Sequence, residues 1–164
     1  MPRCTLERVN ELLSYDPDDG VFRWKASRGS VKAGAVAGTV SDKGYVRINI
    51  DGEIIRAHRL AWGVIHGAWP EFEIDHENTV KTDNRFTNLR PATRSQNEAN
   101  KSITKLNKSG YKGVFWYRRT QLWKAEIRKD GKKIYLGCFS DPLAASQAYE
   151  KAALALHGDF ARLT

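Results

Sequence analysis

A carboxylate, an imidazole and several carboxamides stand close together near the middle of the chain. Asp75 and His76 are adjacent, and Asn88 and Asn97 follow in the same polar stretch. Histidine is the natural general base at physiological pH, because its ordinary pKa lies near neutrality. Oxygen ligands from aspartate and asparagine suit a hard divalent cation such as Mg²⁺. A general base together with such a cation is what hydrolysis of a phosphodiester bond requires.

Each of these residues also has an ordinary structural interpretation. An Asp-His pair by itself is usually structural, and Asn84 and Asn88 in a polar loop are turn formers by default. Asn97 could equally be an exposed helix residue. A strand would place Asp75 and His76 on opposite faces, so their convergence on one cleft requires a strand end or a bulge.

The ordered set resembles a known family of nucleases. His76 follows Asp75 directly, Asn88 lies twelve residues after His76, and Asn97 lies nine residues further on. This spacing is similar to that of HNH homing endonucleases of the phage type, and the similarity extends over residues 12–100. The resemblance implies a ββα-metal fold with His76 as general base and with Asp75 and Asn97 as metal ligands. It also implies that Asn88 braces the loop and orients His76.

The cofactor expected from this resemblance is one divalent cation, Mg²⁺ in the first place and Mn²⁺ as the alternative. Cys4 and Cys138 form no metal-type pair, which speaks against structural zinc. Glu77 adds a carboxylate where relatives often carry an apolar residue, and we interpret it as solvated. His58 is interpreted as packing against the site rather than as catalytic. No small-molecule cofactor is expected.

The C-terminal part of the chain resembles a second family. The stretches SGYKGVFWY, WKAEIR, YLGCF and AASQAYEKAALALHGDFARL are similar, over residues 109–163, to the plant Apetala/ethylene-response-factor DNA-binding domain. The resemblance implies a three-stranded antiparallel sheet in the major groove, with one helix behind it. The DNA-facing residues that it implies are Lys112 and Arg118 in the first strand, Glu126 and Arg128 in the second, and Lys133 and Tyr135 in the third, with Arg119 next to Arg118.

This second resemblance has departures that bear on specificity. Phe115 stands where the plant family has a basic contact residue, and lysine replaces arginine at two other positions. The plant target sequence is therefore not transferred to this chain. Trp116 and Trp123 have two equal interpretations, as packing residues of the sheet and as DNA contacts.

Short elements must position these side chains, and the sequence predicts an α+β fold. Apolar spacing predicts helices over 4–14 and 58–66, a polar helix over 94–101 and a helix that opens at Asp141-Pro142. Turn residues and the alternation of apolar with polar residues predict strands. These are expected over residues 21–24, 34–40, 45–50, 53–58, 71–75, 89–93, 110–119, 122–130 and 132–139.

These elements group into four expected parts. They are an N-terminal helix and β-rich region (1–57), a ββα-metal nuclease module (58–100), a basic linker (101–109) and a DNA-binding domain with a three-stranded sheet packed on one helix (110–164). The linker could also touch phosphates.

The charge of the chain favours an anionic partner. The sequence has 27 Lys and Arg against 19 Asp and Glu, a formal net charge of +8. Together with the two resemblances, this balance predicts double-stranded DNA as the partner. No apolar run is long enough for a membrane span, and no secretory signal precedes the first helix. We expect a monomer in the cytoplasm, which would be that of a bacterial host if the chain is phage-encoded.

The function predicted from the sequence is that of a metal-dependent DNA endonuclease, either a homing-type nickase or a double-strand cutter. One alternative is a non-catalytic, sequence-specific DNA-binding protein or regulator with a decayed nuclease module. The retained set of Asp75, His76, Asn88 and Asn97 argues against that decay. A second alternative, an RNA-binding or structural accessory protein, accounts for the charge but not for this set.

Overall fold

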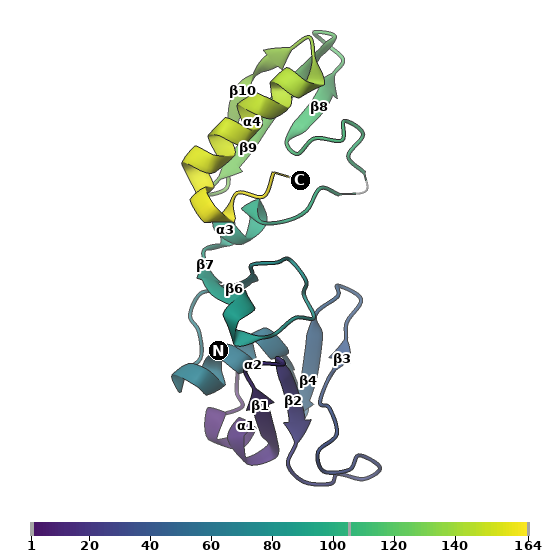
Figure 1. Cartoon of the computed structure of the whole chain (residues 1–164), viewed down its shortest axis with the longest axis vertical. Helices are drawn as coiled ribbons and strands as arrows, with labels where there is room; N and C mark the ends of the chain where they lie inside the picture. Colours follow the sequence, from purple (N-terminus) through teal and green to yellow (C-terminus); the bar gives the residue numbers. More distant parts are fainter. Residues whose placement is uncertain (1, 105, 164) are drawn as a thin grey trace. The chain divides into compact units, whose positions relative to one another are not determined.

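The computed structural model describes residues 2–104 and 106–163, so Met1, Lys105 of the expected linker and Thr164 lie outside the described residues. The fold is α+β, as predicted (Figure 1). The chain divides into two compact units, the first up to Pro91 and the second from Ala92 onwards. The four-part division expected from the sequence stays a prediction.

The first unit contains short elements grouped into three small sheets. The sheets are β1-β2, β3-β4-β5 and β6-β7. The elements are α1 (Leu6–Leu12), β1 (Leu13–Asp16), β2 (Val21–Trp24), β3 (Thr39–Val40), β4 (Val46–Ile50), β5 (Glu53–Arg56), α2 (Ala57–His66), β6 (Glu73–His76), the 3-10 helix η1 (Phe86–Asn88) and β7 (Leu89–Ala92).

The first helix is shorter than predicted. It begins after its N-cap Thr5, whose hydroxyl accepts a hydrogen bond from the Arg8 amide. It ends at Leu12, because Leu13 is already extended and pairs with Trp24 in the first antiparallel sheet. The apolar spacing that predicted a helix over 4–14 therefore continues into a strand, whose alternate residues face the same core.

The strand predicted over 34–40 is reduced to its last two residues. Gly34 and Gly38 both adopt positive φ, at 82° and 105°, which interrupts extended pairing. A Cβ at Gly38 would lie 2.9 Å from the Arg47 carbonyl oxygen, so glycine is required where this segment crosses β4.

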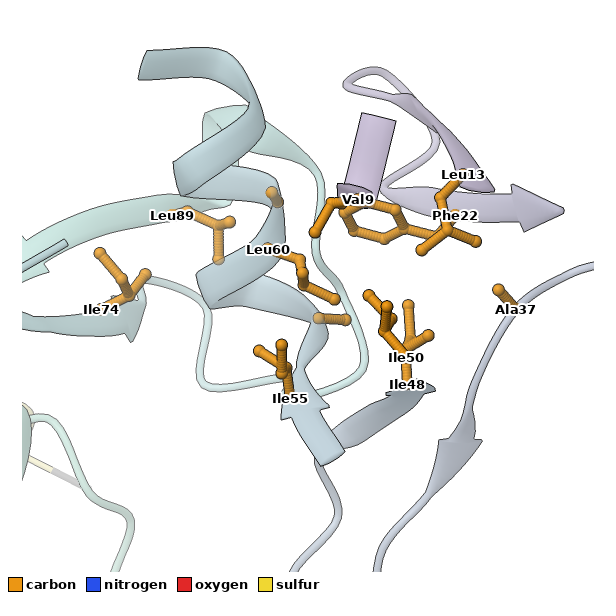
Figure 2. Close-up of a cluster of buried hydrophobic side chains, with 12 residues drawn as sticks. Val9, Leu13, Phe22, Ala37, Ile48, Ile50, Ile55, Leu60, Ile74 and Leu89 are labelled. Atoms are coloured by element: carbon orange, nitrogen blue, oxygen red, sulfur yellow. The ribbon is translucent and has the colours of Figure 1, made fainter. Parts of the chain in front are cut away.

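The core of the first unit is a single cluster of buried aliphatic and aromatic side chains, drawn in Figure 2. β4 shows how the sequence builds it, since Ile48 and Ile50 are buried whereas Arg47 and Asn49 are exposed. The buried residues of the cluster are Val9, Leu13, Phe22, Ala37, Ile48, Ile50, Ile55, Ala57, Leu60, Ala61, Ile74 and Leu89. Because Ile74 is part of this cluster, the core fixes the strand that carries Asp75 and His76.

The turn between β1 and β2 lies directly against the loop that precedes η1. Tyr15 donates a hydrogen bond through its hydroxyl to the Asn84 carbonyl oxygen at 2.7 Å. Gly20 has φ +73°, and a Cβ there would lie 2.3 Å from the Arg85 backbone nitrogen. Gly20 therefore permits a close backbone approach between two loops of the first unit.

The second unit consists of a helical turn followed by a three-stranded antiparallel sheet and a long helix. The sheet order is β10-β9-β8, and α4 lies along one face of it (Figure 1). The elements are α3 (Arg94–Ala99), β8 (Val114–Tyr117), β9 (Leu122–Lys129), β10 (Lys132–Phe139), α4 (Pro142–His157) and the 3-10 helix η2 (Gly158–Phe160).

Two helix starts in this unit follow the sequence prediction. Asp141 is the N-cap of α4 and accepts from the Ala144 amide at 2.9 Å, with proline at the first position. Thr93 is the N-cap of α3 and forms a capping box with Gln96. Within the described parts of the chain, no helix combines the length and apolar character that crossing a bilayer demands.

The close approach at Gly20 yields a test of the packing between the two loops. Gly20→Ala should destabilise the first unit by about 1–3 kcal/mol more than Gly52→Ala, because added bulk in a packed site costs that much. Gly52 also has positive φ (+87°), but a Cβ added there would meet no described atom within 4 Å, so this variant controls for backbone strain alone. Urea unfolding of both variants measures the difference, and equal losses of stability would show that the packing of Gly20 contributes nothing.

Candidate active site and nucleic-acid interface

Asp75 and His76 occupy the last two positions of β6, and both are buried. The Asp75 carboxylate accepts a hydrogen bond from Arg90 Nε at 3.0 Å, and only 6% of its side chain is exposed. Arg90 lies on the neighbouring strand β7. The pairing of β6 with β7 therefore holds the carboxylate beside a cation within the first unit.

The His76 ring is oriented by a carboxamide. Its Nε2 atom lies 3.2 Å from Asn84 Oδ1, while Asn84 Nδ2 donates to the Thr82 carbonyl oxygen at 3.1 Å. Since that amide orientation makes Oδ1 an acceptor, Nε2 carries the proton of the neutral ring and the lone pair resides on Nδ1. The sequence interpretation gave this orienting role to Asn88; the hydrogen bond that the structure describes instead comes from Asn84.

Asn88 braces the loop between β6 and η1. Its Oδ1 accepts from the Asn78 amide at 3.0 Å, and its Nδ2 donates to the Asp83 carbonyl oxygen at 2.8 Å. Its own carbonyl oxygen accepts from the Glu77 amide at 2.9 Å. The Asn88 side chain thus joins two parts of the loop. The Glu77 side chain is exposed, as expected from its interpretation as a solvated carboxylate.

Aromatic rings surround His76. The ring of His58 meets it edge-on with centroids 5.0 Å apart, and the Tyr45 ring lies 6.0 Å away. Arg56 and Lys81 each place a cation 4.8 Å from the Tyr45 ring centroid. Two positive charges therefore lie over the Tyr45 ring, which itself lies near the imidazole, and they would attract an approaching phosphate.

Burial controls the protonation of both histidines. Loss of hydration lowers the pKa of His76, although the hydrogen bond that His76 donates to Asn84 and the charge of Asp75 oppose this. The pKa of His58 lies well below its ordinary value, again chiefly because of burial. His58 Nδ1 is buried and has no hydrogen-bond partner among the described residues. Both rings are therefore neutral at physiological pH, which is the state that a general base must have.

Asp75 supplies a carboxylate oxygen, which is the donor type that hard cations accept, and this carboxylate is paired with Arg90. Across residues 2–104 and 106–163, no three His, Cys, Asp or Glu side chains gather into a metal-binding group. Mg²⁺ is commonly held by one or two carboxylates with water and substrate phosphate completing its shell, so a single buried aspartate fits that mode.

Asn97, the second metal ligand that the resemblance implies, lies on α3 in the second unit. Asp75, His76 and Asn88 belong to the first unit. The structure thus gathers three of the four residues of the set in one unit, and the role of Asn97 stays a prediction.

The face of the C-terminal sheet opposite α4 carries most of the residues expected to contact DNA. Ala125 and Ile127 of β9 are buried on the helix side, so Glu126 and Arg128 project from the open face. Their partners in β10 project with them, because Tyr135 pairs with Glu126 and Lys133 pairs with Arg128.

Charged and aromatic groups alternate on this open face. Glu126 accepts from Lys124 at 2.9 Å and pairs with Lys133 at 3.1 Å, and these contacts lower its pKa. The Lys124 ammonium lies between 5.4 and 5.7 Å from three ring centroids, those of Phe115, Tyr117 and Tyr135.

Two of the expected contact residues lie outside the first strand. Arg118 follows the last residue of β8 and lies in the turn with Arg119, and both side chains are exposed. Lys112 precedes β8, and its ammonium donates to three backbone carbonyl oxygens, those of Ala99, Lys101 and Arg162. The predicted strand placement was therefore wrong for both, and the Lys112 ammonium is occupied by the protein itself.

The structure adds residues to the site that sequence reasoning did not select. Asn84 was weighed only as a turn former, and Tyr45, Arg56, Lys81 and Arg90 were not weighed as site residues at all. Only Asn84 carried a usable signal, because it lies in the same polar loop as Asn88. Of the others, Arg90 contacts Asp75, Tyr45 lies near His76, and Arg56 and Lys81 lie over the Tyr45 ring, and such contacts depend on tertiary packing.

The buried His58 predicts a loss of stability on acidification. Its folded pKa is depressed, so the unfolded chain binds a proton that the folded unit resists, and stability falls as the pH drops below about 6.5. In wild type, the free energy of unfolding should fall as the pH is lowered from 7 to 5. His58→Leu should make this fall smaller, by up to about 1.4 kcal/mol per pH unit. Urea unfolding at several pH values measures it, with exposed His66→Leu as control. An unchanged slope in His58→Leu would contradict the prediction.

Comparisons with known proteins bear on both parts of the chain. The HNH endonuclease family model matches residues 56–99. APETALA2-like protein 2 of Oryza sativa is 46% identical over 50 residues, which are 30% of this chain and 12% of that protein. This chain therefore spans only about an eighth of the length of that plant relative. Ethylene-responsive transcription factor ERF024 of Arabidopsis thaliana is 46% identical over 55 residues, 32% of this chain and 30% of that protein.

A solved structure described as DNA binding and cleavage by the HNH homing endonuclease I-HmuI is 21% identical, with a TM-score of 0.44, and covers 96% of this chain and 91% of that one. Protein 3.8 of Escherichia phage T7 is 30% identical over 108 residues, which are 65% of this chain and 88% of that protein. With that identity and coverage, the chain belongs to the same family as Protein 3.8, and its residues 56–99 form an HNH endonuclease domain.

Proposed function

We propose that the chain hydrolyses phosphodiester bonds in double-stranded DNA, with His76 as the general base. The observation that carries this proposal is the buried, neutral His76 ring, which Asn84 orients beside Asp75 within the segment that matches the family. A base of this kind takes a proton from the attacking water as the new bond to phosphorus forms. The lone pair on Nδ1 is the site that accepts this proton.

The neighbouring groups have separate tasks in this proposal. Asn84 holds the tautomer and direction of His76, and Asn88 keeps the loop in place. Arg56 and Lys81 attract the phosphate backbone next to the base.

Asp75 and Asn97 would hold a divalent cation, Mg²⁺ or Mn²⁺, and when bound it would stabilise the charge that develops on the phosphorane and the leaving oxygen. Asp75 presents a buried carboxylate for this purpose, and Asn97 offers a carboxamide oxygen.

The C-terminal sheet supplies DNA affinity in this proposal. Its open face presents Arg128, Lys133 and Tyr135, and Arg118 and Arg119 extend from the adjoining turn. A three-stranded sheet can enter the major groove with alternate side chains directed at base edges. The similarity to Apetala-type plant proteins supports this use of the sheet.

One active centre per chain favours nicking of one strand by a monomer. A supercoiled plasmid would then be converted first to the open circular form. Early accumulation of linear plasmid would instead indicate coordinated cleavage of both strands.

His76→Ala should lower the rate of plasmid cleavage with Mg²⁺ or Mn²⁺ by about 10²–10⁴-fold, because that is the usual contribution of a positioned general base. Asn84→Ala should lower it by roughly 10–100-fold, which is typical for a residue that orients a catalytic histidine or ligand. His66→Ala is the matched control, since His66 is exposed at the end of α2. Intact plasmid with wild type under every metal would disprove cleavage, and undiminished cutting by His76→Ala would remove His76 from the mechanism.

Arg128→Ala should weaken DNA binding by about 1–3 kcal/mol if Arg128 contacts a base edge. Its side chain is exposed, so the fold of the sheet should be unchanged. Gel-shift titrations at several salt concentrations measure the affinity and its salt slope, with Lys151→Ala on α4 as a control that removes the same charge elsewhere. Equal affinities for Arg128→Ala and wild type would exclude Arg128 from the DNA-contacting face.

A further inference from the structure

The helix α3 is built into the second unit at both of its ends. It packs against α4, β9 and η2 of that unit. In its first turn, Ser95 Oγ accepts a hydrogen bond from the Asp130 amide at 3.0 Å, in the turn between β9 and β10. The helix that carries Asn97 is therefore attached to the strands that carry Glu126 and Lys133.

Lys112 fixes the other end of α3. Its Nζ donates to the carbonyl oxygen of Ala99, the last residue of α3, and to those of Lys101 and Arg162, at 2.7 and 3.1 Å for the latter two. The last carbonyl groups of a helix have no partner within the helix, so an ammonium there satisfies an acceptor that would otherwise need water. Three donors meet three acceptors, which gives the ammonium a complete set of hydrogen bonds.

The surroundings of Lys112 distinguish it from a DNA contact. Burial lowers its pKa to about 8, whereas the exposed lysines of the sheet retain open access to solvent. Asn107 and Ser109 close the adjoining turn, since Ser109 Oγ donates to the Val114 carbonyl oxygen at 2.7 Å and Asn107 Nδ2 donates to that of Tyr111 at 2.8 Å. The segment that leads into β8 is thus held in place on both sides of Lys112.

We propose that Lys112 is a positioning residue for DNA cleavage, which acts by fixing α3, and with it Asn97, to the DNA-binding sheet. The inference rests on the proposed function. Asn97 and the sheet belong to one compact unit, whereas Asp75 and His76 belong to the other. Lys112 therefore determines how well Asn97 is presented for metal binding without touching either DNA or metal.

The test uses the full chain with Lys112→Met, which keeps the length of the side chain and removes its donors. Lys151→Met, at an exposed position of α4, is the control for the lost charge. Three quantities are measured, namely DNA affinity without divalent metal, the single-turnover cleavage rate at saturating DNA over a range of Mg²⁺, and Mn²⁺ binding to the protein–DNA complex by electron paramagnetic resonance.

We expect Lys112→Met to bind DNA as tightly as Lys151→Met. Its half-saturating Mg²⁺ concentration and its Mn²⁺ dissociation constant should both rise by about 10-fold or more, as for other residues that orient metal ligands. Lys112→Arg, which keeps a cationic donor, should recover part of the loss.

A second variant keeps the proposal testable if Lys112→Met fails to fold. Ser95→Ala removes the hydrogen bond at the opposite end of α3 and leaves Lys112 in place. It should raise the metal requirement in the same direction by a smaller factor, with DNA affinity unchanged. A wild-type metal requirement in Ser95→Ala together with unfolded Lys112→Met would overturn the proposal, because Lys112 would then serve the fold alone.

Two further results would overturn it. Weaker DNA binding by Lys112→Met, with an unchanged cleavage rate and metal requirement at saturating DNA, would make Lys112 a DNA contact. Wild-type behaviour of Lys112→Met in all three measurements would leave it no role in cleavage. If wild type itself does not cut DNA, the proposed function fails, and Mn²⁺ affinity alone decides the question: equal affinity for wild type and Lys112→Met overturns this inference.

Discussion

The loop between β6 and η1 has little regular backbone pairing, and the site depends on the side chains that hold it. Asn78, Asp83, Asn84 and Asn88 satisfy backbone groups that a helix or strand would otherwise pair. Asp83 is fixed in turn by Arg85 through contacts of 2.8 and 2.6 Å, which hold the pKa of its carboxyl well below its ordinary value. A loop held in this way can present one imidazole in a defined direction, because short polar side chains reach nearby backbone groups with little loss of rotamer entropy.

The two units differ in the size of their buried hydrophobic clusters. The first unit buries a cluster of twelve residues and can therefore keep His58, Asp75 and His76 out of water. The second unit has two smaller clusters, and it places its charge on an open sheet face. Burial changes the protonation of an imidazole, whereas exposure keeps cations available to phosphate, so each environment suits the task proposed for its unit.

Local signals predicted much of the fold but only part of the site. The capped starts of α3 and α4, the left-handed Gly67 after α2 and the three C-terminal strands follow from residues that act over a few positions. The resemblance also selected Asp75, His76 and Asn88, which lie in one unit, together with Asn97, which lies in the other. The hydrogen bond of His76 to Asn84 rather than to Asn88, and the Arg90 contact, could not be read from spacing, because which of two nearby amides reaches a ring depends on how the loop closes. The strand placement of Lys112 was wrong for a related reason, because alignment by position carries the residue type across but not the neighbours that bind it.

The contact between the β1–β2 turn and the loop before η1 determines how short a fragment of this chain can be while the site keeps its structure. The segment that matches the family begins at residue 56, yet Tyr15 and Gly20 support the backbone around Asn84 from far upstream. A graft that begins at the family match would carry Asp75 and His76 without the surface against which the following loop is folded. Chimeric proteins built from this chain must therefore take the N-terminal hairpin with the site, and exchange of other segments is restricted to the sequence beyond it.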